Sequence, residues 1–298
     1  MWGQDKAYST LMTELWGSPG QWNVKKSYAA IARKLGVDEE TVRNRIKHLR
    51  ESGFLLGWRL FPNPSILGRR STFLFLELDD PGSKDDAISQ LRRMDGVVTI
   101  VSLYGSGLLL TLFDHEDRRC SRQITGIWTR WEVLTGMALP TSDLRVTVTD
   151  WQIVRLLLKD AERSVREVAR EVGVSTRTVT RRLNEMMGGS AIFITPMVDL
   201  RKASGVSYQL MVQSEEGRKP EVDRLVASKI DNLVFRASYS TNGSIFGFNG
   251  ANVAEGSAIL KWVRRQEGVT SARMNIAEEV VQAFEWLDEE VERRATTR

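Results

Sequence analysis

The residues best suited to chemistry in this 298-residue chain form an outward stripe between positions 175 and 184. Hydroxyls, guanidinium groups and a carboxamide recur there at helical spacing, and such side chains hydrogen-bond to base edges and to phosphates. Val179, Leu183 and Met186 fall at i, i+4 and i+7, which predicts an apolar face on the opposite side of the same helix. The predicted DNA-binding set is Ser175, Thr176, Arg177, Thr180, Arg181, Arg182 and Asn184.

A second short helix must precede this one to position it. Residues 165–172 carry an apolar face, Gly173 permits a turn, and Ser175 can cap the next helix by accepting a backbone N–H. The apolar residues 191–194 then predict a wing strand. Together these features favour a helix-turn-helix with its recognition helix at 176–187. For the cationic stripe alone, an ordinary solvated face is the alternative interpretation.

Composition excludes several other kinds of site. With 42% hydrophobic residues the chain can bury two or more cores, and its net charge of +4 is only a mild bias toward anionic partners. Cys120 is the single cysteine, which excludes an internal disulfide and a zinc site built from cysteines, and His48 and His115 are the only imidazoles. We therefore expect no catalytic residues, metal or cofactor. No apolar run of about 18 residues is present, so we expect a soluble cytoplasmic protein with no membrane contact.

Self-similarity at a long period organises the sequence. Shifting the chain by 137 positions places residues 27–37 over 164–174, Thr41-Val42 over Thr178-Val179, and Gly68 over Gly205. This pattern predicts a tandem duplication of one unit.

The first copy has its own predicted recognition helix, in which Glu39 and Glu40 replace Thr176 and Arg177. These glutamates suit a helix N-terminus but would repel phosphate. We call each predicted helix-turn-helix unit, with the strand that follows it, a head. We therefore expect the second head to bind DNA more firmly than the first. The first head can still read bases through Arg43, Asn44 and Lys47.

Each head is followed by a body with the predicted order strand, helix, strand, strand, helix, strand. This order implies an antiparallel sheet with helices on one face, so the fold class is α+β, with two winged helix-turn-helix domains and two ferredoxin-like domains. The hairpin turns are expected at 104–107 and 241–244. The predicted winged helix-turn-helix domains span 1–64 and 146–202, and the predicted ferredoxin-like domains span 65–145 and 203–298. In the last of these, the acidic residues 278–292 are interpreted as a solvated helix or as a partner surface.

These motifs resemble the Lrp/AsnC family of transcription regulators. The resemblance rests on the GWRLFP motif at 57–62, Ile66-Leu67-Gly68, TDWQIV at 149–154 and STRTVTRR at 175–182, followed by the βαββαβ order. It implies that one chain holds the equivalent of a family dimer whose two sheets pair internally, and that chains pair further through the ferredoxin-like domains. Double-stranded DNA is the expected partner, and because the two predicted recognition helices differ in sequence, we expect an asymmetric or imperfectly palindromic site.

The resemblance also implies a small-molecule effector bound near the hairpin turns. The family's Gly-x-x-Asp turn falls at 105–108 and near 242–245, and neither copy supplies the acid. A purely structural role for these turns therefore stays open. The candidate effector residues are Tyr104, Gly105, Ser106, Gly107, Asn242 and Gly243.

Two other functions remain as alternatives. Siroheme decarboxylases have a similar head-plus-body unit, but they need imidazole or basic groups around a tetrapyrrole, and this sequence offers few imidazoles. A protein-protein adaptor would instead bind polypeptide through the winged heads.

Overall fold

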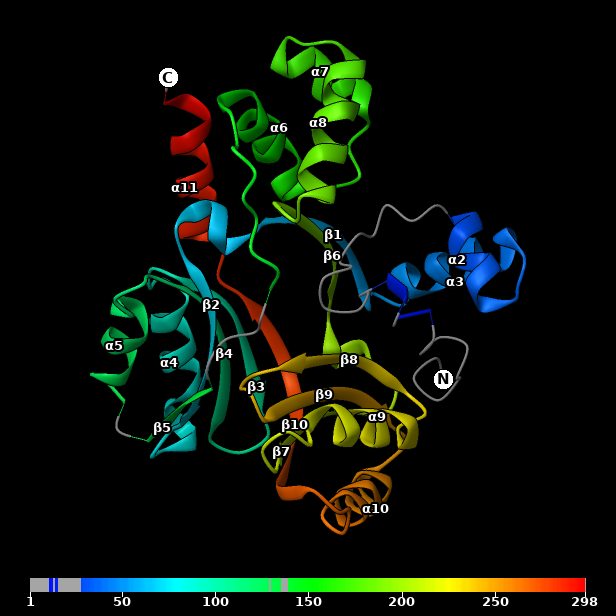
Figure 1. Cartoon of the computed structure of the whole chain (residues 1–298), viewed down its shortest axis with the longest axis vertical. Coiled ribbons are helices and arrows are strands. Elements are labelled where there is room, and N and C mark those ends of the chain that lie inside the picture. Colours follow the sequence, from blue (N-terminus) through cyan, green and yellow to red (C-terminus); the bar gives the residue numbers. More distant parts are fainter. Residues whose placement is uncertain (1–10, 13, 16–27, 129, 135–138, 298) are drawn as a thin grey trace.

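The computed structural model describes residues 11–12, 14–15, 28–128, 130–134 and 139–297. The sequence also predicts an opening helix over residues 8–16, which falls mostly outside the described residues. Two helical heads, a two-stranded ribbon and an eight-stranded sheet make up the described chain (Figure 1).

Each head contains a pair of helices followed by a strand, and in the second head a further helix precedes the pair. In the first head the elements are α2 (Tyr28–Leu35), α3 (Glu39–Glu51), β1 (Leu55–Pro62) and the 3-10 helix η2 (Pro64–Leu67). In the second they are α6 (Val148–Lys159), α7 (Val165–Val172), α8 (Thr176–Gly188), β6 (Ile192–Val198) and the 3-10 helix η4 (Leu200–Lys202).

Each head is followed by a half of the large sheet with two covering helices, and a further helix ends the second half. The first half comprises β2 (Arg70–Glu77), the 3-10 helix η3 (Pro81–Ser83), α4 (Lys84–Leu91), β3 (Val97–Leu103), β4 (Gly107–Asp114), α5 (Arg119–Thr125) and β5 (Trp131–Leu134). The second comprises β7 (Val206–Ser214), α9 (Lys219–Lys229), β8 (Leu233–Ser238), β9 (Gly243–Gly250), α10 (Val253–Val263), β10 (Val269–Gln282) and α11 (Glu285–Thr296).

The large sheet has the strand order β5-β2-β4-β3-β10-β7-β9-β8, and all its pairs are antiparallel. When the four strands of each half are numbered by their order in the chain, they lie side by side in the sheet as fourth, first, third and second. This is the strand order of a ferredoxin-like domain. The long strand β10 joins the halves, because residues 269–277 pair with β7 and residues 277–282 pair with β3. The sequence led us to expect that the two sheets pair with each other. In the structure they join edge to edge, because β10 pairs with strands of both halves.

The two halves also pack their inner faces together. Phe73 and Leu109 from the first half share one buried cluster with Met211 and Ile245 from the second. Helices α4 and α5 cover the outer face of the first half, and α9 and α10 that of the second (Figure 1). This alternation follows from the period of two along a strand, which sends successive side chains to opposite faces.

The strands that follow α3 and α8, the two predicted recognition helices, differ from the predicted wings. β1 and β6 pair with each other in an antiparallel ribbon, with Leu60 opposite Ile194. The predicted wing at 191–194 is therefore the start of a strand that links the heads, since its backbone groups bond to β1. The duplication and the domain boundaries stay predictions, whereas the repeated order of elements is a property of the structure.

Several element bounds also depart from the sequence-based expectation. The segment 278–292 is not a single helix: β10 continues to Gln282, because it gains β3 as a partner, and α11 begins only at Glu285. On α11, Leu287, Val291 and Ala295 are buried in the core of the second head. The sequence also predicts Trp128 on the second helix of the first body, but this residue lies beyond the end of α5 at Thr125.

Candidate nucleic-acid interface

Helix α8 presents the predicted stripe to solvent. Thr176, Arg177, Thr180, Arg181 and Asn184 are exposed. On the opposite face Val179, Leu183 and Met186 are buried, as the i, i+4, i+7 spacing predicts. The placement of these side chains is therefore as expected, and their contact with DNA stays a prediction.

The approach to α8 is fixed by local hydrogen bonds. Gly173 ends α7 in the left-handed region with φ +76°, a conformation that favours glycine. Ser175 then caps α8, accepting a hydrogen bond from the Thr178 backbone N–H at 3.1 Å. The tight turn and the cap set the direction in which the exposed stripe faces.

The two exposed arginines of the stripe differ in their partners. Arg181 is 59% exposed and forms an i,i+4 ion pair with Glu185 at 2.7 Å. Within the described part of the chain, no hydrogen bond or ion pair engages Arg177. An exposed i,i+4 pair is worth only a few tenths of a kcal/mol, roughly 0.3–0.5, so both guanidinium groups can be offered to an anionic partner.

Arg182 requires a correction to the predicted set. Its side chain is only 15% exposed, and it contacts the fully buried carboxylate of Asp150 in α6. Its Nε donates to Asp150 Oδ1 at 2.5 Å, and a second guanidinium nitrogen pairs with Glu185 at 2.6 Å. This arginine joins α8 to α6 inside the head, so we remove it from the proposed DNA surface.

Asp150 remains ionised in this setting. Burial raises the pKa of its carboxyl group, but hydrogen bonds from Arg182 and from Thr147 outweigh that effect and bring the pKa below its usual value. The same carboxylate accepts the Thr147 backbone N–H at 2.7 Å in a reciprocal cap at the start of α6. One buried carboxylate thus both caps α6 and anchors α8.

The corresponding helix of the first head, α3, uses much of its charge internally. Arg43 is 54% exposed and lies 3.0 Å from Glu39 and 3.7 Å from Glu40. Lys47 is 70% exposed and lies 3.8 Å from Glu51. Over their lengths, α3 carries three glutamates and α8 one. Asn44 is exposed on α3, beside the cations that the sequence also proposed for base reading.

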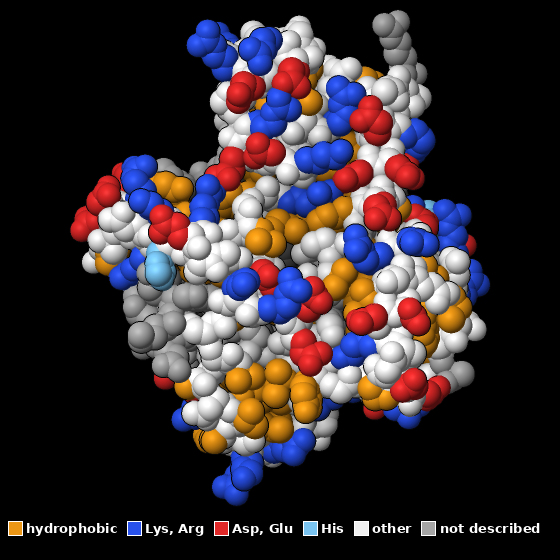
Figure 2. Space-filling view, turned by 180° about the vertical axis from the view of Figure 1, so that it is seen from behind, with side chains coloured by type: hydrophobic (Ala, Val, Ile, Leu, Met, Phe, Trp, Pro, Cys, Tyr) orange, Lys and Arg blue, Asp and Glu red, His pale blue; other side chains and the backbone are white. Residues whose placement is uncertain are grey.

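Basic and acidic side chains are intermixed over the upper part of the molecule, where α6, α7, α8 and α11 lie (Figure 2). The exposed Arg166 and Arg170 of α7 add to the arginines of α8. The local arrangement of cations on these two helices is therefore a better guide to a nucleic-acid-binding surface than the net charge of +4.

The hairpin turns proposed as an effector site lie apart from each other. In the first, Tyr104 is 76% exposed and its backbone N–H donates to the Ile276 carbonyl, while Gly105 has φ +87° and Ser106 and Gly107 complete the turn. In the second turn, the Asn242 carbonyl accepts a hydrogen bond from the backbone N–H of Ser214. Ser214 pairs with Val269, which lies at the other end from Ile276 of the part of β10 that pairs with β7.

Ile276 and Val269 are the β10 residues beside the first and the second turn. About seven strand residues separate them, which is on the order of 20 Å along a strand. At Gly243 an added Cβ would lie 2.5 Å from Tyr239, so this glycine allows close packing. The structure therefore does not bring the proposed effector residues into one site.

A cavity of about 260 Å³ lies between the inner faces of the two half-sheets and the β1–β6 ribbon. Its wall is mostly apolar, with Phe73 on one side, Ile245 on the other and Phe193 from the ribbon. Gln209 is only 6% exposed, lines this cavity, and its Oε1 has no hydrogen-bond partner within the described residues. The partly buried Gln282 also lines it with an unpartnered Oε1. Strand alternation places these carboxamides inward, but sequence alone did not identify them.

The chain is similar in sequence to known proteins. Residues 147–187 match the AsnC-type helix-turn-helix domain. The HTH-type transcriptional regulator Ptr1 of Methanocaldococcus jannaschii is 32% identical over 83 residues, which cover 28% of this chain and 56% of that protein. The chain thus spans about half the length of this curated relative. The chain carries an AsnC-type helix-turn-helix domain.

Two solved structures resemble nearly the whole chain. The siroheme decarboxylase NirDL in complex with an iron-uroporphyrin III analogue superimposes with a TM-score of 0.60 at 16% identity, covering 96% of both chains. A further NirDL structure gives a TM-score of 0.60 at 14% identity, covering 97% of this chain and 98% of that one. At such identities the likeness concerns the fold alone.

The described helices do not meet the requirements for crossing a bilayer. None of them combines the length and the apolar composition that a membrane-spanning helix needs.

Proposed function

We propose that this protein is a sequence-specific regulator of transcription that binds double-stranded DNA mainly through its second head. The observation that carries the proposal is the exposed stripe of α8, on a helix-turn-helix that matches the AsnC type. Its hydroxyl, guanidinium and carboxamide groups are those that hydrogen-bond to phosphates and base edges. The first head contributes less, because α3 carries three glutamates against one on α8, and Glu39 and Glu40 at its N-terminus repel phosphate.

The proposal is tested by comparing two double variants in gel-shift titrations. Arg177→Ala with Arg181→Ala is expected to weaken duplex binding more than Arg43→Ala with Lys47→Ala. All four side chains are exposed, so neither variant should disturb a core. If Arg177 and Arg181 contact phosphates, the dependence of log affinity on log salt should become shallower by about two in the second-head variant. Equal losses in the two variants would contradict the proposed division of labour.

The target is proposed to be an asymmetric or imperfectly palindromic site, because the two recognition helices differ in sequence. Selection from random duplexes tests this, and a perfect inverted repeat as the sole preference would overturn it. Half-sites are expected at whole helical turns, roughly 10 base pairs apart. Pairing of chains through the ferredoxin-like domains is part of the same proposal, and sedimentation of the protein with and without DNA tests it.

We infer that a small-molecule effector binds in the cavity between the half-sheets. The apolar wall and the unpartnered carbonyl oxygens of Gln209 and Gln282 suit a neutral ligand that donates hydrogen bonds. A neutral solvatochromic naphthalene probe should bind and shift its emission to the blue, and Gln209→Leu should alter the position of that emission. Unchanged emission with the wild-type protein would contradict a ligand site there.

The two alternative functions give different results in simple assays. A tetrapyrrole polycarboxylate needs cations, and Arg236 is the only cationic residue among those lining the cavity within the described chain. A new absorption band of bound siroheme would favour a decarboxylase. Failure to bind any duplex at low salt, or an affinity insensitive to salt, would favour an adaptor, because phosphate contacts release counterions.

A further inference from the structure

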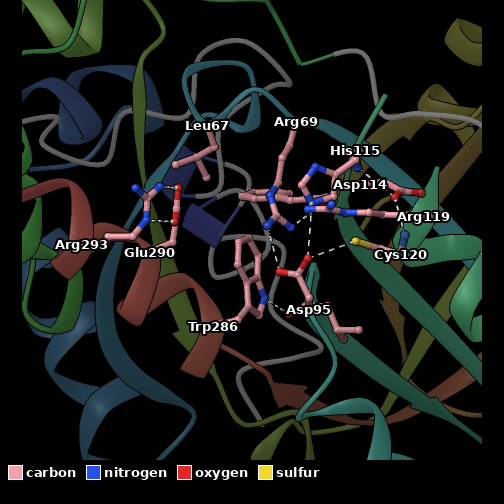
Figure 3. Close-up of polar contacts among 12 residues, drawn as sticks. Leu67, Arg69, Asp95, Asp114, His115, Arg119, Cys120, Trp286, Glu290 and Arg293 are labelled. Carbon is pink, nitrogen blue, oxygen red and sulfur yellow. Dashed lines mark hydrogen bonds and ion pairs between the residues drawn. The ribbon is translucent and has the colours of Figure 1, made fainter. Parts of the chain in front are cut away.

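Three side chains with metal-binding atoms converge at one end of the first half-sheet (Figure 3). Asp95 lies between α4 and β3, His115 directly follows β4, and Cys120 belongs to α5. His115 Nε2 lies 3.4 Å from Asp95 Oδ2, and Cys120 Sγ lies 3.6 Å from the same oxygen. All three ligand atoms lie within 4.8 Å of one another.

We propose that Asp95, His115 and Cys120 bind a divalent transition-metal ion of the zinc type. In tetrahedral coordination, bonds of about 2.0–2.3 Å separate a nitrogen and an oxygen ligand by roughly 3.4 Å, and a sulfur and an oxygen ligand by roughly 3.6 Å. The two separations that involve Asp95 Oδ2 are 3.4 and 3.6 Å, so both pairs already have this spacing. The ligand atoms of His115 and Cys120 lie within 4.8 Å of each other and would close to roughly 3.6 Å around a shared ion. Three protein ligands leave the fourth position to solvent or to a small ligand.

The surroundings hold two of the three ligands in place. Asp114 is buried, and its carboxylate accepts the backbone N–H groups of His115 at 2.9 Å, Cys120 at 3.0 Å and Ser121 at 3.2 Å. This carboxylate fixes the loop that carries His115 and Cys120. Such supporting contacts around a metal set ligand orientation and contribute to affinity.

The third ligand is oriented by an arginine and a close backbone approach. Arg69 donates to Asp95 Oδ1 at 2.9 Å, which leaves Oδ2 facing His115 and Cys120 (Figure 3). The next residue, Gly96, has φ +83°, and a Cβ there would lie 2.8 Å from Cys120 Sγ. Glycine at this position therefore permits the close approach of the cysteine to the aspartate.

Arg119 is the group that a metal ion must displace. One of its terminal nitrogens lies 2.6 Å from His115 Nε2, where it donates to the lone pair that a metal would use. Arg119 is exposed, so its guanidinium can turn toward solvent. We expect this positive charge to compete with a bound cation at short range.

Cobalt(II) is a suitable probe because thiolate coordination produces a charge-transfer absorption band. Cys120 is the only cysteine in the full sequence, so such a band can come only from this residue. The intact protein should bind one equivalent of Co²⁺ with this band, and Zn²⁺ should abolish it. Cys120→Ser should remove the band, and His115→Ala or Asp95→Asn should weaken Co²⁺ affinity by about 100-fold or more.

His48→Ala is the matched control, because His48 is the only other histidine and lies on α3 in the first head. It should leave Co²⁺ affinity unchanged. Circular dichroism establishes whether each variant folds. Arg119→Ala alters only an exposed side chain and should tighten Co²⁺ binding by about tenfold, which tests the site without removing a ligand. Absence of a thiolate band in both the wild type and Arg119→Ala, or equal affinities in His115→Ala and His48→Ala, would overturn the proposal.

Discussion

Replacing Arg182 with alanine should separate folding of the second head from its contact with DNA. Asp150 is fully buried, and Arg182 supplies the cation beside it. Without the guanidinium, the carboxylate keeps, among the described residues, only the donors of Thr147. Removal of one partner from a buried ion pair costs about 3–5 kcal/mol. Because Arg182 is 15% exposed, water can partly solvate the vacated site, and we expect the lower value, about 3 kcal/mol.

The neighbouring Arg181→Ala is the matched control. It removes the same side-chain type from the same helix, but Arg181 is 59% exposed and pairs only with Glu185 among the described residues. Its loss should cost roughly 0.5 kcal/mol or less. Arg181→Ala should therefore weaken DNA binding in a folded head, whereas Arg182→Ala should weaken it by destabilising that head.

Hydrogen exchange of peptides from residues 147–187 is the appropriate assay, because a chain with several packed units need not unfold in a single step. A loss of about 3 kcal/mol corresponds to roughly 150-fold faster exchange through local opening. Peptides from β2 and β4 provide an internal reference. Protection in Arg182→Ala within twofold of the wild type would refute the structural role of this arginine, and so would equal losses in the two variants.

Two further predictions concern groups buried elsewhere in the same framework. Because the pKa of Asp150 is lower in the folded protein than its ordinary 3.8, its stabilising effect is fully present above pH 3.8 and is lost as the pH falls through the folded pKa. Hydrogen exchange in α8, measured over an acid titration, should show this loss of stability. The loss on acidification should be smaller in Arg182→Ala than in the wild type. Gln209→Leu should raise the Tm of the ligand-free protein by removing an unpartnered buried carbonyl, a gain of about 1 kcal/mol, and a lower Tm would contradict the absence of a partner.

Local patterns predicted the parts of the second head that depend on local physics. The spacing of Val179, Leu183 and Met186 fixes which face of α8 is buried, and the cap by Ser175 depends on residues three positions apart. The buried role of Arg182 could not be seen in this way, because its partner Asp150 lies 32 residues earlier. Helical periodicity placed Arg182 at the border of the exposed face, and only tertiary packing decides which side it joins.

Long-range strand pairing explains the larger departures from the predicted fold. Residues 191–194 have the composition of a strand, but nothing local specifies that β1 rather than solvent lies beside them. Likewise, residues 278–282 are rich in acidic side chains, and they form a strand because β3 supplies a pairing partner. The cluster of Asp95, His115 and Cys120 was also hidden, since an Asp separated by 20 residues or more from the other two matches no local metal motif.

The cross-packing of the two heads bears on how the protein would meet DNA. The core of the first head includes Val234 from the second half-sheet, and the core of the second includes Phe113 from the first half-sheet and Leu60 from the opposite head. Arg50 of α3 also lies 2.5 Å from Glu162, in the loop before α7. Both α3 and α8 are thus held by buried contacts and paired strands, not by a free linker. A rigid connection favours one separation of half-sites, because changing the distance between α3 and α8 would require breaking these apolar contacts.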